Sequence, residues 1–217
     1  MKPAAVGRLT LALAAATALA VASTASAGLG SGLGSALGSG LLGAALPSCG
    51  AVSYPFAQFG DRGAYCSPAN NGFESGAAGW TLSGRASVVA DNEPWHVSGP
   101  GRNALDLPPG ASAISSPVPI SLLDPHLRLF ARSSAADGAL RVQVLFQGLT
   151  GNLTGILNVS DLSPSDYTSW EPSSDVASLL ALPLGTTSAQ VLVTSLASAG
   201  DWRIDDVFVD PWLNRLG

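Results

Sequence analysis

The stretch Leu140-Arg141-Val142-Gln143-Val144-Leu145-Phe146-Gln147-Gly148 decides the fold class of this chain. Every second residue from Leu140 to Phe146 is apolar, and these residues alternate with Arg141, Gln143, Leu145 and Gln147. Side chains of a β-strand point alternately to opposite faces, so this period of two predicts a strand with one buried and one polar face.

Similar short runs lie on both sides of this stretch, separated by Gly, Pro, Ser and Asp, which are typical of turns. No window of 11–18 residues has sustained helical periodicity, apart from one or two turns around Val176–Leu182. The further predicted strands are Thr81–Leu82, Ala86–Ala90, Ala104–Leu107, Leu127–Ala131, Gly155–Val159, Ala189–Leu196 and Trp202–Val209. Many short strands predict an all-β fold over residues 70–213, either a two-sheet antiparallel β-sandwich or a barrel.

The first 27 residues have the pattern of a signal peptide rather than of a folded element. Lys2 and Arg8 precede an uncharged run from Leu9 to Val21, and Ala25-Ser26-Ala27 matches the small-residue cleavage pattern. A membrane anchor is the alternative, but a run of this length is too short to span ~30 Å of hydrocarbon as a helix. We expect cleavage after Ala27 and a secreted, extracellular protein with no transmembrane segment after cleavage.

The charge balance argues against a nucleic-acid partner. The chain has 10 basic and 15 acidic residues, and removal of Lys2 and Arg8 leaves 8 basic residues and a net charge of −7. The remaining chain contains no lysine, so it lacks the basic surface that tracks a phosphate backbone.

Residues 28–46, rich in Gly, Leu, Ser and Ala, predict a flexible linker, because so much glycine is costly to order in a helix. A small-residue helix that packs on a membrane or a partner is the alternative. Residues 47–69 form a loop-like lead-in that we expect to lie on the following domain. They carry both cysteines, Cys49 and Cys66, and an even cysteine count in an exported chain predicts a disulfide.

Six residues are candidates for ligand binding. If the strands 127–131 and 140–148 are neighbours, their polar faces combine Arg128, Arg132, Arg141 and Gln143 into one patch. A solvated sheet face is the alternative, since antiparallel sheets commonly expose one side. Trp95 and His96 lie in a polar loop, where Trp95 is either a platform for a sugar ring or a packed side chain.

Both ends of the predicted domain resemble a known family. The opening Asn71-Gly72-Phe73-Glu74 with Gly79-Trp80, and the closing Trp202-Arg203-Ile204-Asp205-Asp206-Val207, resemble carbohydrate-binding β jelly rolls with a galactose-binding-like sandwich, which accompany secreted glycoside hydrolases. The lead-in Cys49 to Asp61 is similar to that of a group of exported bacterial proteins, a resemblance that implies no activity. The first resemblance implies a jelly roll over residues 70–210, with polysaccharide as the partner.

The same resemblance implies a structural calcium ion where the two ends of the domain meet. Glu74 with Asp205, or in second place Asp206, would hold it, and backbone carbonyls and water would complete the six to eight oxygens that Ca²⁺ takes. The alternative is a group of exposed carboxylates that form salt bridges with arginine.

No catalytic motif is present in the sequence, which has no G-x-S-x-G, H-E-x-x-H or P-loop pattern. We therefore expect an exported, non-catalytic binding domain, with carbohydrate as the first ligand class. A structural or interaction protein of the cell envelope is the alternative, with a cell-envelope component as partner, and a small secreted hydrolase is a remote one.

Overall fold

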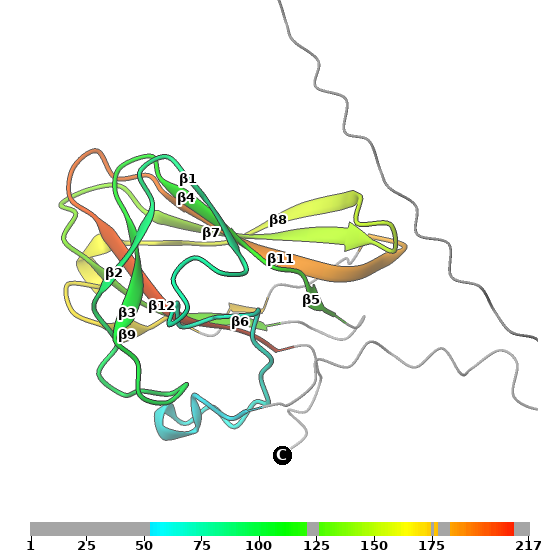
Figure 1. Ribbon diagram of the computed structural model, residues 1–217, viewed down its shortest axis with the longest axis horizontal. Helices are drawn as coiled ribbons and strands as arrows, with labels where there is room; N and C mark the ends of the chain where they lie inside the picture. The colour runs from blue at the N-terminus through cyan, green and yellow to red at the C-terminus, as the bar shows by residue number, and fades with distance from the viewer. Residues whose placement is uncertain (1–52, 121–125, 175, 178–182, 211–217) are drawn as a thin grey trace, which may run out of the picture. The chain divides into compact units, whose positions relative to one another are not determined.

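The computed structural model describes residues 53–120, 126–174, 176–177 and 183–210. These residues belong to one compact unit, 44–217, and form two β-sheets that pack face to face (Figure 1), with no α-helix among them. The predicted all-β, two-sheet antiparallel sandwich is confirmed. The predicted signal peptide, the predicted linker, Cys49 and residues 211–213 lie outside the described residues.

The strands are short and joined by turns. Their bounds are β1 (Trp80–Ser83), β2 (Ser87–Ala90), β3 (Asn103–Leu107), β4 (Ser112–Ser115), β5 (Val118–Pro119), β6 (His126–Ser133), β7 (Leu140–Gly148), β8 (Leu153–Leu162), β9 (Glu171–Pro172), β10 (Val176–Ala177), β11 (Thr186–Ser195) and β12 (Trp202–Asp210). Two 3₁₀ turns, η1 (Ala57–Phe59) and η2 (Pro164–Asp166), complete the described elements.

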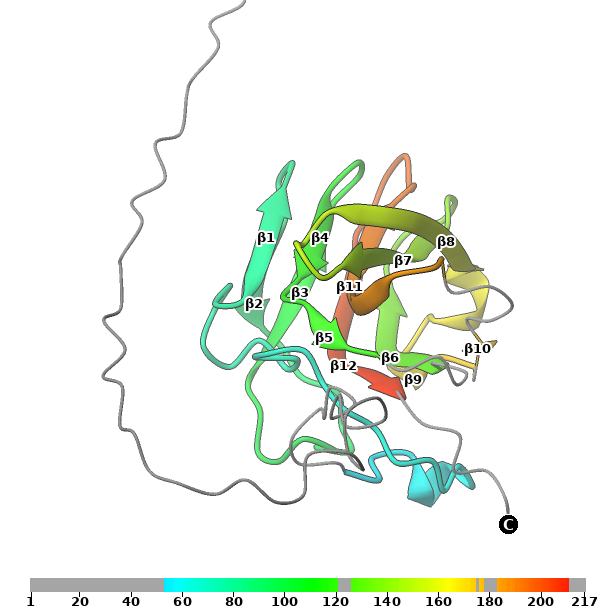
Figure 2. The same ribbon diagram turned by 90° about the vertical axis from the view of Figure 1, so that its right-hand side faces the viewer.

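Each sheet has six antiparallel strands. The first, here called the β7 sheet, has the order β1-β4-β11-β7-β8, with β5 paired to β11; the second, the β12 sheet, has the order β10-β6-β12-β3-β2, with β9 paired to β6 (Figure 2). Consecutive strands β6 and β7 therefore lie in opposite sheets. The expectation that their polar faces form one patch is wrong, because the chain crosses the sandwich between them.

Every strand that the sequence predicts exists, with ends displaced by up to three residues. The sequence missed β4, since Ser112-Ala113-Ile114-Ser115 contains only one large apolar residue. It also favoured a helical turn where Val176–Ala177 pair with β6 as β10. A two-residue strand is defined by its partner and not by its own periodicity.

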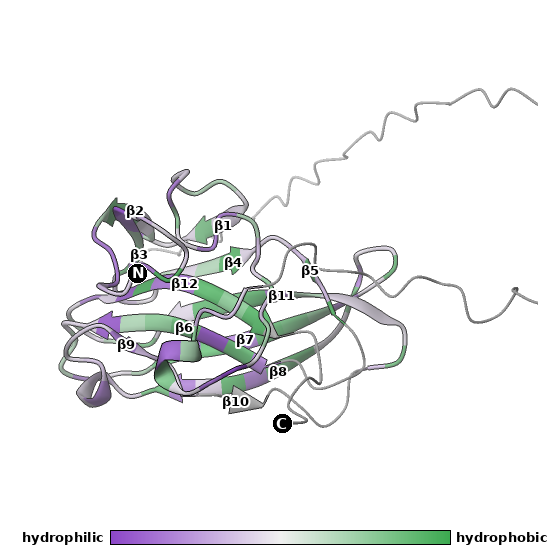
Figure 3. Cartoon of the chain, turned by 90° about the horizontal axis from the view of Figure 1, so that it is seen from below, coloured by the Kyte–Doolittle hydropathy of each residue, from purple (hydrophilic) through white to green (hydrophobic). Residues whose placement is uncertain are grey.

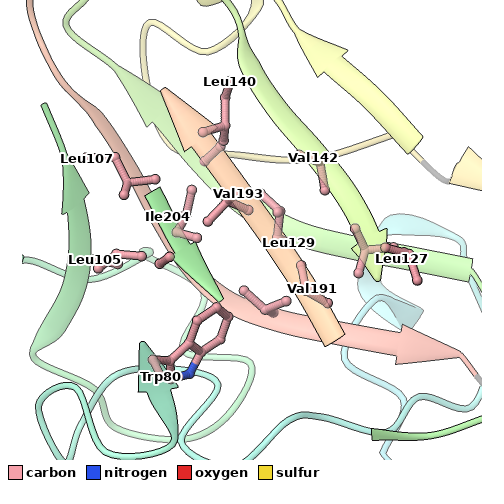
Figure 4. Close-up of a cluster of buried hydrophobic side chains, with 14 of the residues drawn as sticks. Trp80, Leu105, Leu107, Leu127, Leu129, Leu140, Val142, Val191, Val193 and Ile204 are labelled. Carbon is pink, nitrogen blue, oxygen red and sulfur yellow. The ribbon is translucent and has the colours of Figure 1, made fainter. Parts of the chain in front are cut away.

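The main core lies between the sheets, and both contribute to it (Figure 4). Leu105, Leu129 and Ile204 of the β12 sheet face Val142 and Val193 of the β7 sheet, and each is at most 2% exposed. Burial of each such side chain contributes about 1.5–3 kcal/mol. Hydrophilic and hydrophobic segments alternate along the strands (Figure 3), as the period of two in the sequence predicts.

The described part of the lead-in, residues 53–69, covers the middle of the outer face of the β12 sheet and is seen in cyan in Figure 1. Phe56 is fully buried there and stacks on Phe130 of β6, with 5.4 Å between ring centroids, and its edge meets Phe208 of β12 at 5.6 Å. Tyr65 joins this second apolar cluster at 5.1 Å from Phe56. The lead-in is thus part of the folded domain, and both faces of β6 and β12 are buried along their middle.

Arg128 anchors the lead-in and is not part of an exposed patch. It is 7% exposed, lies 4.1 Å from the centre of the Phe56 ring, and donates to Asp61 at 2.9 Å. It also donates twice to the Ser173 carbonyl, at 3.0 and 2.8 Å. A residue whose charge is held by three protein groups is occupied, so Arg128 is corrected from a predicted ligand contact to a structural one.

Cys66 is buried beside β12, where its backbone pairs with Val209 in both directions at 2.8 Å. Its predicted partner Cys49 lies outside the described residues, so the disulfide stays a prediction. Within the described segments, no helix is long and apolar enough to cross a membrane.

Candidate functional site

The outer face of the β7 sheet carries polar side chains from adjacent strands. Arg141, Gln143 and Gln147 of β7 and Gln190 of β11 occupy the positions opposite to the core, and all are partly exposed. Gln147 donates to the Gln190 side-chain oxygen, and Gln190 donates to the Ser115 carbonyl at 2.7 Å. These bonds hold two of the amides in place beside each other.

Aliphatic side chains lie between these polar groups. Leu192 is the partner of Ile114, and Leu145 is the partner of Ile156, so two apolar pairs cross the strands in register. At one end of the same face, Arg141 makes a two-pronged ion pair with Asp161 at 2.9 and 3.0 Å. The face is mixed polar and aliphatic, and no aromatic ring projects from it within the described strands.

The structure separates the six predicted ligand-binding residues. Arg141 and Gln143 lie on the open face of the β7 sheet, whereas Arg132 lies on the β12 sheet beside Asp91, at 2.7 Å. Trp95 and His96 lie in the loop between β2 and β3.

Trp95 packs on the lead-in cluster and does not stand free. Its ring meets the Phe59 ring edge-on at 5.2 Å and lies 5.3 Å from Phe130, so one side of it is covered. His96 is exposed, with a left-handed backbone (φ 52°), and its Nδ1 lies 3.1 Å from the Asn92 amide nitrogen. Packing, the alternative weighed for Trp95, is what the structure shows.

A second candidate site lies where the opening segment of the domain meets strand β12, the region to which the family resemblance assigns calcium. Glu74, Asn92 and Asp206 line a cavity of about 160 Å³. Two glycines border these oxygens: a Cβ on Gly72 would lie 2.7 Å from Asp206 Oδ1, and one on Gly101 would lie 1.9 Å from Asn92 Oδ1 and 3.1 Å from Glu74 Oε1. Any larger residue at either glycine would displace an oxygen from the cavity.

Asp206 in the cavity wall is 4% exposed, and two further buried carboxylates outside the lining, Glu93 and Asp205, are 0% and 1% exposed. Glu93 accepts from the Trp95 and Val97 backbone amides. Asp205 accepts from the amides of Glu93 and Asp206 at 3.1 and 2.8 Å, and does not line the cavity. The structure thus favours Asp206 as the partner of Glu74, whereas the resemblance put Asp205 first.

Burial raises the pKa of Asp205 to about 9, and the adjacent Asp206 carboxylate adds to this shift. Burial also raises the pKa of Asp206 to about 6, although its hydrogen bond with Ser98 opposes the shift and the Glu93 carboxylate adds to it. Sequence reasoning missed Glu93, because its loop gives no periodic signal. The one sequence feature near Glu93 is the Pro94-Trp95 pair that follows it.

The oxygens at the cavity fit calcium by type. Carboxylate and amide oxygens are the hard ligands that Ca²⁺ takes, and Glu74, Asp206 and Asn92 supply both kinds. The described residues contain no group of three or more His, Cys, Asp or Glu placed to hold a metal ion. A calcium ion here would therefore need backbone carbonyls or water besides the side chains.

Comparison with known proteins gives similarity to solved structures only. No family model and no curated protein matches this chain. It is similar to a family 61 carbohydrate-binding module, TmCBM61, solved in complex with β-1,4-galactotriose, with 18% identity over 66% of this chain and 97% of that one and a TM-score of 0.40. It is also similar to the CBM22-1 xylan-binding domain of Paenibacillus barcinonensis Xyn10C, with 15% identity, 64% and 90% coverage and a TM-score of 0.43.

A third similar structure is the enzymatically active domain of tailspike protein 4 from bacteriophage CBA120, with 15% identity and a TM-score of 0.44. This chain covers 21% of that domain's length, and 66% of its own residues are matched. Further similar structures are a family 11 carbohydrate-binding module of Clostridium thermocellum, with 13% identity, and a family 22 xylan-binding domain, with 12% identity, each with a TM-score of 0.43.

Proposed function

We propose that this chain is an exported, non-catalytic domain that binds polysaccharide on the outer face of the β7 sheet. One contrast between the sheets carries the proposal. The lead-in buries the middle of the outer face of the β12 sheet, whereas Gln143, Gln190 and their neighbours on the β7 sheet keep partial exposure.

The side chains on this face suit neutral sugars. A glutamine amide both donates and accepts hydrogen bonds, which matches the hydroxyl groups of a saccharide. The aliphatic pairs Leu192–Ile114 and Leu145–Ile156 supply apolar surface for the faces of the rings. Without an aromatic platform, hydrogen bonds would carry much of the specificity, so we expect an extended chain that contacts several strands at once.

Loss of one amide on this face should weaken polysaccharide binding. Removing a hydrogen-bonding partner costs roughly 1.4 kcal/mol, which is about tenfold in affinity. We expect a loss of that size for Gln143→Ala, measured by titration calorimetry of residues 28–217 with soluble xylan, galactan and β-glucan. Gln58→Ala is the matched control, because Gln58 is exposed in η1 on the lead-in. Wild-type binding by Gln143→Ala, or no binding to any of these polymers, contradicts the proposal.

A second candidate function, association with an apolar component of the cell envelope, is favoured by exposed leucines. Leu149 is 88% exposed, Leu184 is 99% exposed, and the edge strand β8 adds Leu153 at 55% and Ile156 at 57%. Leu184→Ser should then lower retention on the envelope and leave polysaccharide binding unchanged. Unchanged retention of Leu184→Ser on the envelope contradicts this second function and leaves polysaccharide binding as the candidate.

Export is part of the proposal and rests on residues 1–27. We expect the mature protein from its host to begin at Gly28, with Cys49 and Cys66 joined in one chain; closing a loop of this length would stabilise it by roughly 3 kcal/mol. Mass spectrometry before and after reduction measures both. An intact Met1 contradicts the signal peptide, and two free thiols contradict the disulfide.

We also propose a structural calcium ion held by Glu74 and Asp206, with the Asn92 side chain. Bound there, it would supply positive charge beside the buried carboxylates. The charge would stabilise their ionised forms and join the opening and closing segments of the domain. This role is structural and is separate from ligand binding on the β7 sheet.

A further inference from the structure

A second cavity lies on the β12 sheet, at the end that the lead-in cluster leaves open. Its volume is about 310 Å³, and it is lined by Arg132, Ser133, Ser134, Thr168, Asp201 and Arg203. Arg132 of β6 and Arg203 of β12 project outward, because Ala131 and Ile204 beside them belong to the core. The cavity is therefore on the opposite sheet from the proposed polysaccharide face.

The two arginines are held in fixed positions by the protein. They are direct cross-strand partners, an arrangement that repulsion between like charges would otherwise destabilise. Asp91 bridges them, at 2.7 Å from Arg132 and 2.6 Å from Arg203, and Asp106 binds Arg203 at 3.1 Å. Arg132 also lies over the Trp170 ring at 5.7 Å from its centre. A ligand that binds here would not have to order these side chains.

Both arginines keep hydrogen-bonding capacity. Among the described residues, no acceptor takes a bond from Arg132 Nε or Nη1 or from Arg203 Nη2. The same part of the chain supplies no donor to the Asp201 carboxylate, although the Asp201 backbone bonds with Ser134. The exposed Thr168 hydroxyl adds a group that can donate and accept. The cavity thus offers donors, an acceptor and a hydroxyl that the fold itself does not use.

The charges decide which ligand class fits. Two guanidinium groups stand against three carboxylates, those of Asp91, Asp106 and Asp201, which leaves a local net charge of −1. An anionic ligand would be repelled by the Asp201 carboxylate as well as attracted by the two arginines. A carboxylate or phosphate would therefore gain little net binding free energy here. A neutral ligand with adjacent hydroxyls can accept from Arg132 and donate to Asp201 at the same time.

We propose that this cavity is a second binding site, which takes one neutral sugar unit. Its volume is at the lower end of the ~300–1,000 Å³ usual for small-molecule sites, so it holds a single unit rather than an extended chain. The site shares no residue with the β7 sheet and does not depend on the proposed polysaccharide binding there.

The test is an NMR titration of residues 28–217 with galactose, glucose, mannose, xylose and arabinose, and with glucuronate as the anionic probe. The Trp170 indole N–H and the Nε–H signals of Arg132 and Arg203 report on the cavity. We expect saturable shifts of these signals with at least one neutral sugar, with a dissociation constant of about 1 mM. Asp201→Ala should weaken that binding roughly tenfold. Asp166→Ala, which removes an exposed carboxylate outside the cavity, should leave it unchanged.

Three results would overturn the proposal: no saturable shift with any neutral sugar, tighter binding of glucuronate than of every neutral sugar tested, or wild-type affinity in Asp201→Ala. Gln143→Ala separates this site from the polysaccharide face, because it should leave the cavity titration unchanged. If a neutral monosaccharide saturates the cavity signals but no polysaccharide binds to the protein, the proposal for the β7 sheet fails and the proposal for this cavity stands.

Discussion

Millimolar calcium is expected to raise the melting temperature of this protein by about 8–16 °C. An ion that binds only the folded state stabilises it by RT ln(1 + [L]/Kd), so millimolar calcium over a micromolar site contributes about 4 kcal/mol. A domain of this size gains about 2–4 °C per kcal/mol. Differential scanning calorimetry in calcium and in chelator measures the difference.

Two variants test the residues that would hold the ion. Glu74→Gln keeps an oxygen for the backbone amides of Arg102 and Asn103 but removes the charge. Asp206→Asn likewise keeps an oxygen for the Ser98 amide and removes the buried charge. Both should lose most of the calcium response and still fold. Asp161→Asn, on the exposed edge of the β7 sheet, should respond as the wild type does. Equal melting temperatures in calcium and in chelator contradict the metal site.

The raised pKa values give this response a pH dependence. Without metal, folded Asp205 binds a proton more strongly than the unfolded chain does, since its pKa is about 9 instead of 3.8. The free energy of unfolding in chelator should therefore fall as pH rises from about 4 to about 9. Calcium competes with these protons, and the pKa of Asp206 is about 6, so the gain from calcium should be larger at pH 8 than at pH 5. A gain that does not change with pH places the ion away from these carboxylates.

Replacing Arg128 by alanine is expected to lower the free energy of unfolding by about 3–5 kcal/mol, because it removes a buried guanidinium that lies 2.9 Å from the largely buried Asp61 carboxylate. The side chains of Arg128 and Asp61 are 8% and 11% exposed, so solvent screens the pair little. Phe56 also loses its contact with the guanidinium. Urea unfolding followed by tryptophan fluorescence measures the effect.

The matched control is Arg141→Ala, which breaks an ion pair of similar length on the open β7 sheet. The side chains of Arg141 and Asp161 are 39% and 38% exposed, and such pairs contribute about 0–1 kcal/mol. The double variant Asp61→Asn/Arg128→Met removes both buried charges and should recover part of the lost stability. Equal effects of Arg128→Ala and Arg141→Ala would mean that the lead-in is not anchored through Arg128.

The burial of side chains could be predicted from the sequence for β7 but only in part for β6. In β7, alternation along Leu140–Gly148 separates buried from partly exposed residues one by one, because one side of this sheet is open. In β6 the same alternation predicted Arg128 on an exposed polar face, whereas Arg128 and Phe130, two residues further along the strand, are both buried. The alternation along one strand shows which side chains are polar. It does not show that a segment distant in the sequence, here the lead-in, covers the strand's second face.

The sequence by itself determined the all-β class, because the period of two along each strand depends only on neighbouring residues. The meeting of the chain's two ends near Glu74 and Asp206 was implied by the resemblance of the end segments to a known family, and not by any local pattern. The tertiary structure alone decided which sheet is open, that Arg128 binds Asp61, and that Glu93 joins Asp205 in a buried acidic group. These contacts join residues 67 and 112 positions apart along the chain. Contacts of such separation depend on how the sheets and loops pack, and no local pattern records that packing.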